Sequence, residues 1–164
     1  MSLSLCRRQF GAGPDARRLE RLAEENQKRQ RDALTFARSS GPLRQPVVEA
    51  LFEAWADYSK ENWDGEEALA VPQNRLEKAI ALVEDLPRRF PAPDGYGDRD
   101  GDFSLEWYRG PRRNITVSIG AGGLLHWAAL IGDDDPRGTW RYSPEAGDSA
   151  PEMLCIMLGR IFRS

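Results

Sequence analysis

Histidine and cysteine are scarce in this chain, which has one histidine and two cysteines among 164 residues. A structural zinc site needs four ligands, mostly cysteine and histidine, at regular spacing. The two cysteines also lie in unlike settings, because Cys6 is followed by arginines and Cys155 sits in an apolar run. The sequence therefore predicts neither a metal site of this kind nor a structural disulfide.

Long hydrophobic runs are missing as well. No stretch approaches the roughly 18 to 20 consecutive apolar residues of a membrane span. The first residues also lack the apolar run and small-residue cleavage site of a signal peptide. We therefore expect a cytoplasmic protein without a membrane partner.

The composition is typical of one globular domain. Charged residues make up 30% of the chain and apolar residues 40%, and five tryptophans add large side chains to a core. A chain of this length is long enough for one hydrophobic core and short for two domains with a linker.

Charge is distributed unevenly along the chain. Residues 1–40 hold nine Lys or Arg against five Asp or Glu, a net charge of +4, and the rest hold 14 against 21, or −7. We expect a basic helical arm over residues 1–41 and a single α+β domain over residues 42–164. The arm either contacts nucleic acid or an acidic partner, or is a solvated helix. The nucleic-acid candidates in it are Arg17, Arg18, Arg21, Lys28, Arg29 and Arg31.

The spacing of apolar residues predicts helices first and strands later. Helical periodicity covers residues 16–38, 46–60 and 72–86. Residues 90–101 are rich in Pro, Gly and Asp and are expected to form a connection. Near Phe103 the period changes to two, which predicts an antiparallel meander of three or four strands. Those strands are expected over 103–108, 114–119, 124–131 and 139–142.

The C-terminal segment predicts a last helix, with Pro151 in its first turn. Its residues are apolar nearly all round up to Phe162. Such a helix is either deeply buried or shared with a partner, so it could also support an oligomer.

A glycine cluster invites a nucleotide-binding interpretation. Gly120, Gly122 and Gly123 follow an expected strand, as in dinucleotide-binding turns. The third glycine of that motif falls on Leu125, however, and no second parallel strand has room to follow. We expect a turn between neighbouring strands and predict no cofactor.

Two groups of aspartates could suggest a cation site. Asp98, Asp100 and Asp102 alternate as at the start of a calcium loop, but Phe103 and Arg109 stand where that loop needs Gly and Glu. The run 133–135 would need further converging ligands. Solvated acidic turns are the simpler interpretation of both.

His126 is the focus of the candidate site, because any histidine-based acid–base chemistry must use it. If its neighbours Leu125 and Trp127 face the core, His126 shares the opposite face with Glu106, Thr116 and Arg141. This patch is either a site or an ordinary solvated sheet face.

The turn Asn62-Trp63-Asp64-Gly65 and the segment Phe103-Ser104-Leu105-Glu106-Trp107 resemble the pattern of a loose group of small uncharacterised bacterial proteins. The resemblance covers roughly residues 55–120 and implies a bacterial origin. In that group another small residue often follows the glycine soon after, whereas Glu66 and Glu67 stand here. Trp63 and Asp64 join the candidate partner-binding residues.

The sequence favours a non-enzymatic interaction module that binds a macromolecular partner. Binding of the immunity, antitoxin or anti-defence type is its most concrete form, because an acidic body could mimic nucleic acid or cover a basic active site. The alternatives are a small enzyme or ligand-binding domain at the face around His126, and a nucleic-acid-binding accessory protein that uses residues 1–40.

Overall fold

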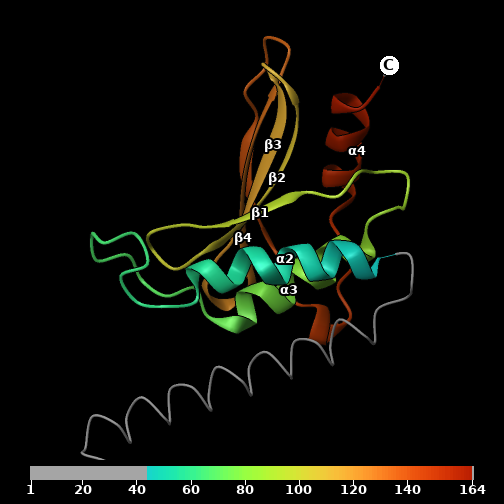
Figure 1. The fold of residues 1–164 in the computed structure, drawn as a ribbon. Helices are drawn as coiled ribbons and strands as arrows, with labels where there is room; N and C mark the ends of the chain where they lie inside the picture. Colours follow the sequence, from blue (N-terminus) through green and yellow to red (C-terminus); the bar gives the residue numbers. More distant parts are fainter. Residues whose placement is uncertain (1–43, 164) are drawn as a thin grey trace, which may run out of the picture. The chain divides into compact units, whose positions relative to one another are not determined.

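The computed structural model describes residues 44–163. Figure 1 shows helices α2, α3 and α4 beside an antiparallel sheet. The arm expected over residues 1–41 lies outside the described residues. Within the described range, no helix is long and apolar enough to cross a membrane.

Two helices form the first half of the described chain. Helix α2 spans Gln45–Tyr58 and buries Val48, Leu51 and Trp55, and α3 spans Gln73–Asp85. The guanidinium of Arg44 donates hydrogen bonds to the carbonyls of Val83 and Leu86 at the C-terminal end of α3. Both helices were predicted from apolar periodicity, and their bounds differ from the prediction by one or two residues.

Five strands form one meander in the order β1-β2-β3-β4-β5, with antiparallel neighbours throughout. The α+β class is confirmed, with five strands instead of three or four. The strand bounds are β1 Asp94–Gly97, β2 Phe103–Gly110, β3 Arg113–Ile119, β4 Leu124–Ile131 and β5 Arg137–Arg141.

Strand β1 was not predicted, since it lies within the segment expected to be a connection. Its sequence, Asp-Gly-Tyr-Gly, has few of the β-branched residues that favour strands. The two glycines instead let α2 approach closely. A Cβ atom on Gly97 would lie 2.5 Å from Cβ of Tyr58, and one on Gly95 would lie 2.8 Å from a methyl carbon of Leu51.

The two faces of the sheet have different roles. On one face, side chains of alternate residues are buried against the helices: α2 packs on β1, α3 on β2 and β3, and α4 on β3 and β4. The fully buried apolar residues of the three central strands are Phe103, Leu105, Trp107, Ile115, Val117, Ile119 and Leu125. The intervening residues therefore point to the other face.

Helix α4 spans Glu152–Ile161 and is buried along one side through Leu154, Met157, Leu158 and Ile161. Met153 and Ile156 are 47% and 51% exposed, so the burial is one-sided and not all round. Arg109 and Arg113 reach from the sheet to the carbonyl of Arg163, each at 2.7 Å, and so hold the end of this helix.

The glycine cluster forms the turn between β3 and β4. Residues Ala121–Gly123 form a single 3-10 turn in which Gly123 has a φ of 75°. A Cβ atom on Gly123 would lie 2.4 Å from the carbonyl oxygen of Tyr142. Because Leu124–Ile131 is a strand and not a helix, the turn is the predicted hairpin and the dinucleotide interpretation is wrong.

Candidate functional site

The candidate site is the sheet face opposite α2, α3 and α4, which we call the open face. It carries the residues that alternate with the buried core positions. Strand register places its central members in two rows of direct cross-strand partners. The first row is Tyr96, Ser104, Ser118, His126 and Thr139, and the second is Asp94, Glu106, Thr116, Ala128 and Arg137.

Three adjoining hollows mark this face. One of about 390 Å³ lies over β3 to β5, and one of about 610 Å³ lies between β3, β4 and the loop from Asp98 to Asp102. These two share Ser118 and His126 in their linings. A third, of about 340 Å³, shares Thr116 and Arg137 with the first. We call these adjoining hollows the depression, and His126 lies where the first two meet.

A hydrogen-bonded group forms the floor beside the β1–β2 loop. The hydroxyl of Ser104 donates to Oδ2 of Asp98 at 2.5 Å and lies 2.6 Å from the hydroxyl of Ser118. Ser104 is only 1% exposed, and it is the one buried polar residue among those described. Burial raises the pKa of the Asp98 carboxyl, and the nearby charge of Asp100 raises it further, while the Ser104 hydrogen bond opposes the rise.

The open face is polarised across its width. Asp94 and Glu106 lie on the side of β1 and β2, whereas Arg137 and Arg141 lie on β5 at the opposite edge. His126 lies between them, on β4, and is exposed. A partner that covers this face would therefore meet negative charge at one edge and positive charge at the other.

Two of the three aspartates in the β1–β2 loop have protein partners. Asp98 accepts hydrogen bonds from serine hydroxyls, and Oδ1 of Asp102 lies 3.9 Å from Nε of Arg75. Burial also raises the pKa of Asp102. No cluster of three or more metal-ligating side chains occurs among residues 44–163. Asp98 is half-buried, so it is not simply a solvated turn residue.

Four of the six candidate partner-binding residues share the open face. Glu106 and Thr116 are direct partners, and His126 lies one strand further and one row away. Arg141 pairs with Leu124 and is exposed on the same face at the β5 edge.

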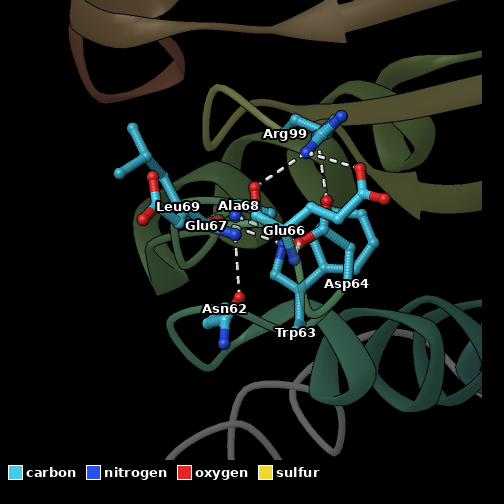
Figure 2. A network of polar contacts seen from close by, with 8 residues as sticks. All are labelled: Asn62, Trp63, Asp64, Glu66, Glu67, Ala68, Leu69 and Arg99. Atoms are coloured by element: carbon cyan, nitrogen blue, oxygen red, sulfur yellow. Dashed lines mark hydrogen bonds and ion pairs between the residues drawn. The ribbon is translucent and has the colours of Figure 1, made fainter.

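Trp63 and Asp64 lie elsewhere, in the loop between α2 and α3, where their polar groups are used locally (Figure 2). Oδ1 of Asp64 accepts the backbone N–H groups of Glu66 and Ala68 at 2.8 and 3.1 Å. Its Oδ2 pairs with Nε of Arg99 at 2.9 Å. These backbone hydrogen bonds, above all that from Glu66, lower the pKa of Asp64.

This loop supports the wall of the depression. Arg99 also donates to the Glu66 carbonyl at 2.8 Å, and its own carbonyl accepts the N–H of Leu69 at 3.0 Å (Figure 2). Arg99 lines the larger hollow together with Asp98 and Asp102. The Trp-Asp-Gly turn thus anchors the β1–β2 loop, and Asp64 has a structural role in the described chain.

Sequence reasoning missed several residues of the site. Ser104 and Ser118 alternated correctly with core residues, but only strand register shows that they are neighbours. Arg137 was missed because the fourth expected strand began at Thr139, whereas β5 begins two residues earlier. Thr139 lay in the expected strand but was not named as a site residue. The nucleic-acid candidates Arg17, Arg18, Arg21, Lys28, Arg29 and Arg31 lie outside the described residues.

Comparisons with known proteins add no assignment to this geometry. No family model, curated protein or solved structure matches the chain.

Proposed function

We propose that this protein is a non-enzymatic bacterial interaction module that acts in the cytoplasm and binds a macromolecular partner through the open face. The observation that carries the proposal is the depression of adjoining hollows over β3 to β5, which no described helix covers. A sheet face lined mainly by polar side chains offers an extended surface on which a partner can bind.

The charge of the described residues supports a charged partner. Residues 44–163 carry 14 basic and 21 acidic side chains, so their net charge is −7. An acidic domain with a polarised binding face suits a partner with a basic functional surface. Inhibition of such a partner, as in immunity, antitoxin or anti-defence proteins, is the most concrete form of the proposal.

The test is recovery of the partner with the full-length protein as bait in its native host at physiological salt. We expect wild type to retain one stoichiometric partner. Thr116→Arg should lose it, because Thr116 lines two of the adjoining hollows and a long charged side chain would fill them. Glu53→Arg, on the exposed side of α2, is the matched control and should retain it.

An unchanged melting temperature for Thr116→Arg must accompany the loss, so that unfolding is not its cause. If the bait recovers no stoichiometric partner, or if Thr116→Arg retains the partner as well as Glu53→Arg does, the proposal is wrong.

A small enzyme or ligand-binding domain is the second candidate. It is favoured by the hydrogen-bonded group of Asp98, Ser104 and Ser118 beside His126, at the bottom of the larger hollow. His126→Ala separates the two functions: it should abolish turnover or binding of a small molecule, whereas binding of a macromolecule that also contacts Thr116 and Arg137 should be weakened but not lost. Nucleic-acid binding by residues 1–40 stays a prediction.

A further inference from the structure

The sheet has two edge strands in the described part of the chain, β1 and β5, and β5 pairs only with β4. An exposed edge strand presents unpaired backbone donors and acceptors that another strand can bind. The residues of β5 that could bind another strand are those whose N–H and C=O groups point away from β4.

Three residues of β5 direct their backbone groups outward. Tyr142 donates its N–H to Gly123 at 2.8 Å, and Pro136 accepts the N–H of Ala129 at 2.9 Å. Because inward hydrogen bonds recur at every second residue of an antiparallel strand, Gly138 and Trp140 also bond to β4. The intervening residues Arg137, Thr139 and Arg141 therefore present their N–H and C=O groups to solvent.

The same three residues place their side chains on the open face, where two are arginines. Arg137 is paired only with Asp135, at 3.5 Å, and the two side chains are 78% and 71% exposed, so this ion pair is weak. Arg141 makes no ion pair with any residue from 44 to 163. Two cations thus lie four residues apart along the β5 edge.

The opposite face of this edge is aromatic. Trp140 stacks on Trp127, with ring centroids 5.0 Å apart and an interplanar angle of 15°. Both tryptophans are partly exposed. A strand added to β5 would therefore place alternate side chains beside arginines on one face and beside Trp140 on the other.

These charges disfavour a second copy of this chain at the edge. Two β5 strands that pair antiparallel about Thr139 would place Arg137 of one copy opposite Arg141 of the other. Like charges directly opposite each other destabilise a strand pair. Carboxylates at the same positions would be attracted.

We infer that β5 docks an extended segment of the partner that alternates carboxylate and apolar side chains and adds a further strand to the sheet. This inference rests on the proposed function and names the chemistry of the one segment that the partner places at β5. The partner's basic surface would lie at the opposite side of the open face, toward Asp94 and Glu106. The carboxylates would lie beside Arg137 and Arg141, and the apolar residues would pack against Trp140.

The test uses the full-length protein and a panel of short capped peptides that alternate glutamate with valine, isoleucine or threonine. We expect at least one to bind and to slow hydrogen exchange of the Arg137, Thr139 and Arg141 amides. Matched peptides with lysine in place of glutamate should not bind. Peptides N-methylated at alternate residues should bind at least roughly tenfold more weakly, because they lose backbone hydrogen bonds.

Substitutions in β5 test whether the peptides bind at this edge. Thr139→Pro removes an outward N–H, which edge strands tolerate, and should weaken binding by roughly tenfold or more, whereas Thr139→Val should not. R137E/R141E should reverse the preference toward the lysine peptides. Hydrogen exchange of β2 and β3 amides shows whether each variant is folded.

Two results would overturn the inference. One is that no glutamate peptide of the panel binds. The other is binding that is unaffected by Thr139→Pro and protects amides elsewhere. If Thr116→Arg still abolishes capture of the native partner, the open face keeps its proposed function and only the strand-addition mode is wrong.

Discussion

Two aspartates of this protein, Asp98 and Asp64, lie in environments that shift their pKa values in opposite directions. Asp98 is half-buried beneath the depression, and burial raises its pKa. Asp64 receives two backbone N–H groups and the Arg99 guanidinium, and its pKa is lowered. The protonation of these two residues therefore affects stability with opposite signs.

Asp98→Asn is expected to become more stable relative to wild type as pH rises from about 3 to 7. The folded protein holds the Asp98 proton more tightly than the unfolded chain, whose pKa is near 3.8. Wild-type stability therefore falls as pH rises through the window above that value, whereas asparagine has no proton to lose. Urea unfolding of both proteins across this range measures the difference.

Asp64→Asn is the control, and its difference from wild type should change in the opposite direction. The charged form of Asp64 stabilises the fold, so its contribution is present above pH 3.8 and is lost as pH falls through the lowered pKa. Parallel trends for the two variants would show that burial of Asp98 does not set its pKa.

At the scale of secondary-structure elements, α2 packs closely against β1, the first edge strand of the sheet. The side chain of Tyr58 lies directly over Gly97, where even a Cβ atom would be 2.5 Å away. Contacts this short require one element to move, and overpacking in a core usually costs about 1–3 kcal/mol.

Gly97→Ala should therefore destabilise the protein by about 1–3 kcal/mol, measured by denaturant unfolding. Adding Tyr58→Gly should make the Gly97 substitution much less costly, since it removes both the Cβ atom and the ring that the new methyl group would meet. Gly159→Ala, in α4 with no atom near the new methyl group, should stabilise by roughly 0.5–1 kcal/mol. Equal effects at the two glycines would contradict the close contact of α2 and β1.

The elements that were predicted from the sequence are those in which the spacing of apolar residues within the element itself indicates a helix or a strand. Leu105 and Trp107 on β2, and Ile115 and Val117 on β3, show the alternation of a half-buried sheet. Strand β1 has no such pattern, because its place depends on Tyr58 and other distant residues of α2.

The same distinction applies to the site. Alternation was enough to place Glu106, Thr116 and His126 on one face. It could not reveal that the β1–β2 loop brings Asp98 onto Ser104, which is a tertiary contact. The aspartate of the Trp-Asp-Gly turn was a binding candidate because sequence cannot show that Arg99, which is distant along the chain, already pairs with it.

On the scale of the whole molecule, we consider two surfaces of the described residues by which copies could associate. One is the β5 edge with its arginines, and the other is the outer side of α4, where Met153 and Ile156 are exposed. Edge strands in natural proteins often carry charged residues that prevent pairing with another copy. Charge at β5 therefore has two compatible effects, since it repels a second copy and attracts an acidic strand.

Removal of that charge should convert the edge into a self-association site. We expect R137T/R141T to dimerise with rising concentration in sedimentation experiments, because threonine favours strands and no longer repels its counterpart. Adding Thr139→Pro should abolish the dimer. The control K60T/R88T removes the same charge from exposed positions outside the sheet and should not dimerise. If Ile156→Glu dissociates the dimer and Thr139→Pro does not, association runs through α4, and β5 is not the edge at which strands add.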